Sequence, residues 1–239
     1  MNSNPKIIVA LDLETKEQAE TIVSKLNPAL CRLKVGKSLF TSLGPEWVKV
    51  IQNLGFDVFL DLKFHDIPFQ IASSCRDAAH LGVWMMNLHA LGGTKMLKAG
   101  KEALDAHQQK TGKRPLLIGV TILTSHSEAD LTELGLTGSI NDNVLRLAGL
   151  CHKAGLDGVV CSAQEAAQIK NNFGSDFLCV TPGIRLKDQS HHDQVRVLTP
   201  LEAVKAGSDY LVMGRAIVES ADPNQVLSQV IEELKHELV

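Results

Sequence analysis

One charged segment of the sequence has residue types and spacing suited to acid–base and electrostatic chemistry, Val58-Phe59-Leu60-Asp61-Leu62-Lys63-Phe64-His65-Asp66. In a strand, period two places Asp61 and Lys63 on one face and the neighbouring leucines on the other. Asp66 follows just beyond the expected strand end. A solvated ion pair is the alternative, but unpaired charge among apolar neighbours is costly. An ammonium group beside carboxylates can stabilise developing negative charge and donate a proton.

Charged residues close other apolar runs as well. Asp12 ends the run Ile7 to Leu11, and Lys34 lies within Arg32 to Val35. In a parallel barrel the chemistry lies at the carboxyl ends of the strands, so these charges join the candidate site. His65 and His89 also lie near strand ends, where we interpret them as hydrogen-bonded or packing residues that support the site.

Two glycine-containing segments near the C-terminus are suited to phosphate. They are Thr181-Pro182-Gly183-Ile184-Arg185 and Gly214-Arg215, each directly after an apolar run. Barrels often bind phosphate in the loops after their last two strands, with backbone N–H groups at a short helix. Gly214 would let the backbone approach closely, and a guanidinium group matches phosphate geometry.

The elements that must position these residues follow from alternating patterns. Segments with helical spacing separate short apolar runs, and capping signals at Thr15, Ser162 and Thr199 mark helix starts. Glycines at 55, 82, 155 and 207 fall where helices should end. The expected strands are Ile7 to Leu11, Arg32 to Val35, Val58 to Leu62, Trp84 to His89, Leu116 to Leu123, Leu156 to Cys161, Phe177 to Val180 and Tyr210 to Met213.

Eight strands alternating with helices predict an α/β protein with a closed, single-domain (β/α)8 TIM barrel over residues 1–239. No G-x-G-x-x-G follows the first strand, which disfavours an open dinucleotide-binding sheet. The extra length from Thr124 to Asn143 predicts an enlarged loop with a short helix. The polar segment 184–198 is interpreted as a loop that closes over the phosphate, with an exposed surface loop as the alternative.

Composition excludes several function classes. With 24 Lys and Arg against 27 Asp and Glu, and no basic run, nucleic-acid binding is not expected. The N-terminus has no apolar signal core and no stretch approaches the ~20 apolar residues of a membrane span, so a cytoplasmic protein without membrane contact is expected. The 5 cysteines form no C-x-x-C pair and are expected to be reduced, mostly buried thiols.

Together these segments resemble the orotidine 5'-phosphate decarboxylase family over nearly the whole chain. The resemblance rests on Asp61 to Pro68, Leu33 to Gly36, Leu123-Thr124-Ser125, Thr181 to Arg185 and Gly214-Arg215. It implies decarboxylation of orotidine 5'-phosphate to UMP, the last step of UMP synthesis. Phe69-Gln70 departs from the Asn-Thr that often follows the motif's proline in the family.

The resemblance also implies a role for each site residue. Lys63 would protonate C6 after CO2 leaves, within a charge network of Asp61, Asp66 and Lys34. Asp66 would enter the neighbouring subunit's site, which implies a homodimer. The implied substrate-binding residues are Asp12 and Lys34 at the ribose, Thr124 and Ser125 at the pyrimidine, Arg185, Gln194, Gly214 and Arg215 at the phosphate, and in addition Ile67 and Pro182.

No sequence motif for thiamine, pyridoxal phosphate or a metal is found, so we expect an enzyme without cofactor or metal. A related alternative is a magnesium-dependent barrel enzyme acting on a sugar phosphate, in which the carboxylates of the Asp-x-Lys-x-x-Asp strand would hold the metal. A catalytically inactive barrel that senses nucleotides is a second alternative. The Lys34, Leu123-Thr124-Ser125 and Thr181 to Arg185 elements favour the pyrimidine enzyme.

Overall fold

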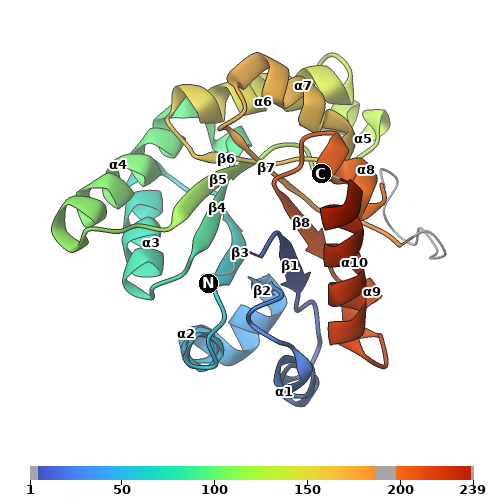
Figure 1. The fold of residues 1–239 in the computed structure, drawn as a ribbon. Helices are drawn as coiled ribbons and strands as arrows, with labels where there is room; N and C mark the ends of the chain where they lie inside the picture. The colour runs from blue at the N-terminus through green and yellow to red at the C-terminus, as the bar shows by residue number, and fades with distance from the viewer. Residues whose placement is uncertain (1–4, 187–197, 238–239) are drawn as a thin grey trace.

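The computed structural model describes residues 5–186 and 198–237, and its eight strands form one closed parallel barrel (Figure 1). Each strand pairs with the next in sequence, and β1 closes the barrel on β8. This confirms the predicted (β/α)8 architecture. The strands are β1 Ile7–Ala10, β2 Arg32–Gly36, β3 Val58–Phe64, β4 Met85–His89, β5 Leu116–Val120, β6 Gly158–Val160, β7 Leu178–Thr181 and β8 Tyr210–Met213.

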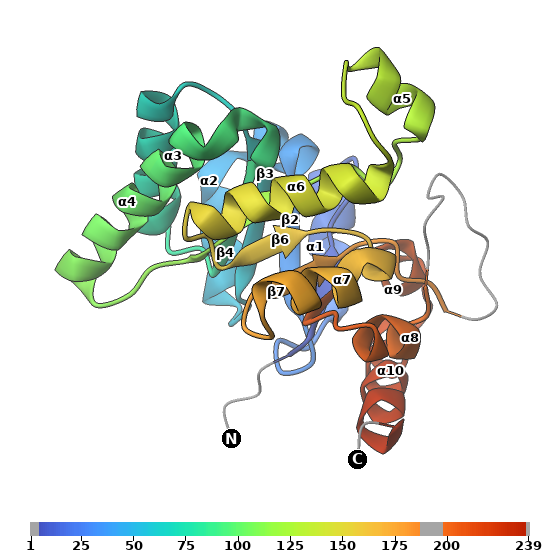
Figure 2. The ribbon, with the colours of Figure 1, turned by 90° about the horizontal axis from the view of Figure 1, so that it is seen from above.

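Helices cover the outside of the barrel in a ring (Figure 1). Short helix α5 stands away from this ring, as Figure 2 shows, and it belongs to the predicted insertion after Thr124. In the described part of the chain, no helix combines the length and the apolar character needed to cross a membrane. The helices are α1 Lys16–Lys25, α2 Lys37–Asn53, α3 Pro68–His80, η1 Ala90–Gly92, α4 Gly93–Thr111, α5 Glu128–Glu133, α6 Ile140–Lys153, α7 Ala163–Phe173, α8 Pro200–Lys205, α9 Arg215–Val218 and α10 Pro223–Glu237.

Local signals in the sequence account for the helix boundaries. Thr15, Ser162 and Thr199 each form a capping box. The hydroxyl oxygen of each accepts a backbone N–H from the first turn of the helix, and the side chain of a Gln or Glu three residues later accepts the backbone N–H of the capping residue. Gly55 and Gly207 have φ values of 92° and 105°, which a residue with a side chain rarely adopts. The predicted starts and ends are therefore confirmed at these positions.

The core has an inner and an outer layer because strand side chains alternate in direction. The outer layer lies between the strands and the helices and includes Leu33, Leu60 and Met86. The inner layer fills the barrel and consists of Ile8, Ala10, Phe59, Met85, Ile118, Val180 and Val212. Because this inner layer is apolar, the buried polar side chains inside the barrel lie toward its two ends.

An arginine lies at the opposite end of the barrel, where the strands begin. Arg32 is 5% exposed, and its guanidinium carbon lies 4.0 Å from the ring centre of Trp84 and 5.5 Å from that of Tyr210. Its Nε also donates to Asp57 at 3.1 Å. These contacts cover the base of the barrel, and Arg32 does not line the cavity at its mouth.

Candidate active site

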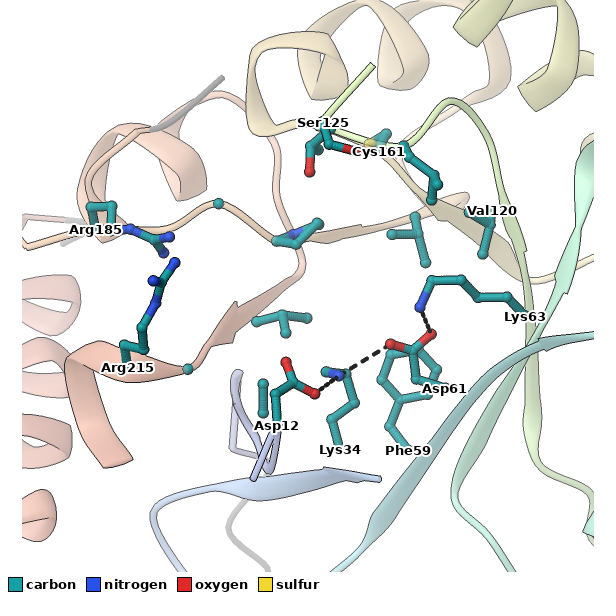
Figure 3. Close-up of a pocket in the computed structure, with 18 of the residues that line it drawn as sticks. Asp12, Lys34, Phe59, Asp61, Lys63, Val120, Ser125, Cys161, Arg185 and Arg215 are labelled. Carbon is teal, nitrogen blue, oxygen red and sulfur yellow. Dashed lines mark hydrogen bonds and ion pairs between the residues drawn. The ribbon is translucent and has the colours of Figure 1, made fainter. Parts of the chain in front are cut away.

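A cavity of about 550 Å³ opens at the carboxyl ends of the barrel strands (Figure 3), within the size range of small-molecule sites. Most of the predicted site residues line it, although they come from six different strands or the loops that follow them. The predicted residues around the cavity are Asp12, Lys34, Asp61, Lys63, Thr124, Ser125, Pro182, Arg185, Gly214 and Arg215.

Four of these side chains form a row of alternating charge along one wall (Figure 3). Nζ of Lys34 lies 2.8 Å from Oδ1 of Asp12 and 3.2 Å from Oδ2 of Asp61. Nζ of Lys63 lies 2.7 Å from Oδ1 of Asp61. Each oxygen of Asp61 thus faces a different ammonium group, and Lys63 ends the row inside the cavity.

The middle of this charged row is largely buried, and burial affects the pKa values of its groups. The side chains of Lys34 and Asp61 are only 9% and 10% exposed, whereas that of Lys63 is 29% exposed. Burial acts to raise the pKa of Asp61, but attraction to Lys34 and Lys63 is stronger and lowers that pKa below its usual range. Burial likewise acts to lower the pKa of Lys34, and attraction to Asp61 and Asp12 raises it instead. Both groups are therefore charged at neutral pH.

The backbone at Lys63 departs from regular strand geometry. Asp61 and Lys63 lie on one side, as period two predicts, but Lys63 has a φ of 50° and the β3–β4 register shifts between Leu60 and Phe64. Asn87 of β4 stabilises this irregularity, because its Oδ1 accepts the N–H of Lys63 at 2.8 Å and its Nδ2 donates to Oδ1 of Asp61 at 2.7 Å. Sequence reasoning missed Asn87, although an amide within the apolar run of residues 85–89 was a possible signal.

Two arginines lie on the other side of the cavity. The guanidinium groups of Arg185 and Arg215 point toward one another in Figure 3, away from the row of alternating charge. Converging guanidinium groups are suited to a doubly charged phosphate. Gly214 precedes α9, which has only four residues, so the arginines rather than a helix dipole supply the positive charge.

Between the charged row and the arginines, the wall is largely apolar. Thr124 and Ser125 belong to the loop after β5, and Pro182 follows β7. Apolar side chains from several strands complete this part of the cavity: Ala10, Phe59, Val120, Ile122, Val160 and Val212. Such a wall fits a flat ring whose few polar atoms meet hydroxyl groups at one edge.

Two predicted residues that the structure describes, Asp66 and Ile67, do not line this cavity. Asp66 is exposed and accepts the N–H of Ile67 at 2.7 Å, while the Ile67 side chain is 63% exposed at the start of α3. Both residues are exposed to solvent instead. Gln194 lies outside the described residues, as does most of the predicted closing loop, but the loop's two ends are adjacent because Ile184 pairs with Leu198.

The two histidines near the mouth of the barrel do not line the cavity. The rings of His65 and His89 stack with centres 5.6 Å apart. Burial, followed by repulsion from His65 and Lys37, lowers the pKa of His89 to about 4, so this ring is neutral at neutral pH. Among residues 5–186 and 198–237, no three His, Cys, Asp or Glu side chains are grouped to hold a metal ion. All five cysteines are buried and reduced, as predicted.

Comparison with known proteins places this geometry in a family. The sequence model of the orotidine 5'-phosphate decarboxylase / HUMPS family matches residues 5–230. The chain is 52% identical over 231 residues to an orotidine 5'-phosphate decarboxylase from Saccharophagus degradans, covering 97% of this chain and 95% of that protein. It is 54% identical over 228 residues to one from Hydrogenovibrio crunogenus, covering 95% of this chain and 94% of the relative.

A solved structure shares the fold as well. The crystal structure of orotidine 5'-phosphate decarboxylase from Lactobacillus acidophilus superposes with a TM-score of 0.86 at 37% identity, covering 97% of this chain and 99% of that one. Sequence and fold agree over nearly the full length of both chains. The chain therefore belongs to the orotidine 5'-phosphate decarboxylase / HUMPS family.

Proposed function

We propose that this protein is an orotidine 5'-phosphate decarboxylase that converts orotidine 5'-phosphate to UMP and CO2 without a cofactor. The observation that carries the proposal is the cavity itself. It combines a buried carboxylate between two ammonium groups with two arginines across an apolar wall. This arrangement matches a nucleotide with a reacting acid group at one end and a phosphate at the other.

The proposed reaction breaks the bond between C6 of the pyrimidine and its carboxyl carbon. CO2 leaves and the bonding electron pair stays on C6 as an sp2 carbanion that no adjacent carbonyl delocalises. The ammonium group of Lys63 stabilises this charge as it develops and then transfers a proton to C6. The neutral amine regains a proton from water after the product departs. Asp61 keeps the ammonium in place, since its Oδ1 lies 2.7 Å from Nζ.

Lys63 supplies only part of the acceleration. Two unit charges ~3 Å apart at an effective dielectric of ~20 interact by roughly 5 kcal/mol, whereas large enzymatic accelerations need about 20 kcal/mol. The remainder requires binding energy from distant parts of the substrate, above all the phosphate. Arg185 and Arg215 lie across the cavity from Lys63 (Figure 3), so a phosphate bound by them would contribute from a distance.

The substrate's orientation follows from the cavity's chemistry. Asp12 and Lys34 would hold the ribose hydroxyls, and Thr124, Ser125 and Pro182 would meet the pyrimidine. The phosphate-binding residues would be Arg185, Gly214, Arg215 and Gln194, with the loop at 184–198 closing over the phosphate. The pairing of Ile184 with Leu198 supports this proposal only in that it holds the two ends of the loop side by side.

We also propose a homodimer in which Asp66 and Ile67 complete the neighbouring subunit's site. Both residues are exposed, and the Phe69 side chain beside them is 73% exposed, so an apolar surface adjoins a carboxylate. Sedimentation should show a dimer. An equal mixture of Asp66→Ala and Lys63→Ala chains should regain up to about a quarter of the wild-type turnover, because about half of the dimers are mixed and each mixed dimer holds one intact site of two. Monomeric active protein would contradict this arrangement.

A spectrophotometric assay with orotidine 5'-phosphate in the presence of EDTA tests the proposed reaction. Loss of substrate absorbance at an undiminished rate in EDTA supports decarboxylation without a metal. Turnover of a sugar phosphate that EDTA abolishes would favour the magnesium-dependent alternative. The contacts of Asp61 argue against that alternative, because both of its oxygens accept from ammonium groups. Nucleotide binding without turnover would indicate a sensor.

A further inference from the structure

Asn87 occupies an unusual position beside the charged row. Its side chain is fully buried in β4, and it does not line the cavity. The single amide contacts two proposed members of the catalytic machinery: its oxygen accepts the backbone N–H of Lys63 at 2.8 Å, and its nitrogen donates to Oδ1 of Asp61 at 2.7 Å. Oδ1 of Asp61 is also the atom that faces Nζ of Lys63 at 2.7 Å.

The pairing of β3 with β4 explains why an amide is needed there. Leu60 pairs with Met86 and Phe64 pairs with Leu88, so residues 61–63 of β3 lie opposite Asn87 alone. Such a bulge leaves backbone groups without their ladder partners. The side chain of Asn87 replaces one missing acceptor for the Lys63 N–H, which would otherwise be an unsatisfied donor in the interior.

The backbone of Lys63 is strained in the same place. Among the described residues, Lys63 alone has a positive φ without being glycine, and its φ of 50° lies in the left-handed region, which is unfavourable for a residue with a side chain. Strain persists only where the surroundings hold it. The bond from Lys63 N–H to Asn87 is the contact that fixes this peptide, and the bond from Asn87 to Asp61 fixes the carboxylate that orients the ammonium.

We propose that Asn87 is a positioning residue that holds the strained Lys63 backbone and the Asp61 carboxylate in register, so that the Lys63 ammonium is aimed at the reacting carbon. This inference rests on the proposed decarboxylation. Asn87 touches no substrate; it acts through the two residues it binds. A misplacement of about 1 Å in a catalytic group costs roughly 10²-fold in rate, which sets the scale of its effect.

Two substitutions separate the functions of the amide. Asn87→Ala removes both hydrogen bonds and should lower kcat by roughly 10²-fold, with UMP affinity changed by less than about fivefold, because the ribose and phosphate contacts are intact. Asn87→Asp keeps an acceptor for Lys63 but places a second carboxylate against Asp61. Two carboxylates in contact hold a shared proton, so the acid limb of the pH profile of kcat should move to higher pH by about one unit or more.

The matched control is Asn143→Ala. Asn143 is also an almost fully buried asparagine, and its Nδ2 donates at 2.9 Å to the carbonyls of Thr137 and Ser139, outside the cavity. Asn143→Ala should lower the melting temperature as Asn87→Ala does, yet keep kcat. If Asn87→Ala does not fold, Asn87→Asp, which conserves shape, carries the test.

The outcomes separate the two proposals. A wild-type protein that leaves orotidine 5'-phosphate unchanged defeats the proposed function, whatever the variants do. If the wild type is active, two results would overturn the positioning role. One is a kcat of the folded Asn87 variants within about threefold of wild type, and the other is a pH profile of kcat in which Asn87→Asp leaves the acid limb unshifted. A kcat loss matched by Asn143→Ala would also overturn it, since general destabilisation would then explain both.

Discussion

Replacing Lys63 with alanine removes the ammonium group at the end of the charged row inside the cavity. Nζ of Lys63 lies 2.7 Å from Oδ1 of Asp61, and the side chain is 29% exposed on the cavity side. Lys34 and Asn87 continue to hold Asp61 in the variant, at 3.2 Å and 2.7 Å. The change is therefore local, and it leaves the residues proposed to bind the ribose and the phosphate untouched.

The expected loss follows from two effects of the same group. An ammonium ~3 Å from a developing carbanion contributes roughly 5 kcal/mol, which corresponds to roughly 10³- to 10⁴-fold in rate. Loss of the proton donor alone typically costs about 10²- to 10⁴-fold. Effects that act through one group do not add fully, so kcat of Lys63→Ala should fall by at least about 10⁴-fold.

The assay follows the absorbance of orotidine 5'-phosphate, and isothermal titration measures UMP affinity, which should change by less than about tenfold. Lys170→Ala is the matched control because Nζ of Lys170 also lies 2.7 Å from a carboxylate, that of Asp209, outside the cavity. Lys63→Arg keeps the charge but holds its protons too tightly to donate them, and should also lose most turnover. Turnover of Lys63→Ala within about tenfold of wild type would refute the proposed role.

Three further predictions concern other parts of the molecule. Arg215→Ala should raise KM by about 10²-fold or more, and inorganic phosphite should partly restore turnover of a substrate that lacks the phosphate; no activation by phosphite would contradict remote binding energy. The pKa of His89 is lowered from 6.5 to about 4, so the unfolded chain binds more protons between these pH values and the free energy of unfolding falls as pH falls through that window. His89→Gln should therefore lose less melting temperature from pH 7 to pH 4 than wild type in calorimetry, and equal losses would count against the burial of a neutral ring. Arg32→Ala removes the cation over Trp84 at the base of the barrel. The loss of about 2 kcal/mol in the free energy of unfolding should lower the melting temperature by roughly 4–8 °C with kcat unchanged. A large fall in kcat would contradict the separation of the base of the barrel from the site.

The chain's alternating patterns determined the barrel. Near-continuous apolar strands require burial on both faces, and the amphipathic segments between them supply the covering helices. Thr15, Ser162 and Thr199 marked helix starts because capping depends on residues three positions apart in sequence. Period two likewise placed Asp61 and Lys63 on one side of β3. These are local relations, so a single sequence carries them.

Only the tertiary structure decided which distant residues meet. Lys34 bridges Asp12 and Asp61 because β2 pairs with β1 on one side and with β3 on the other, which brings the ends of these three strands together. Asn87 contacts Lys63 because the register shifts between β3 and β4, and the amide accepts the N–H that the shift leaves without a ladder partner. The alternation of apolar and polar residues in β3 gave no sign of this shift. Contacts of this kind depend on how strands align in space, which is why the sequence indicated the charges but not the amide that holds them.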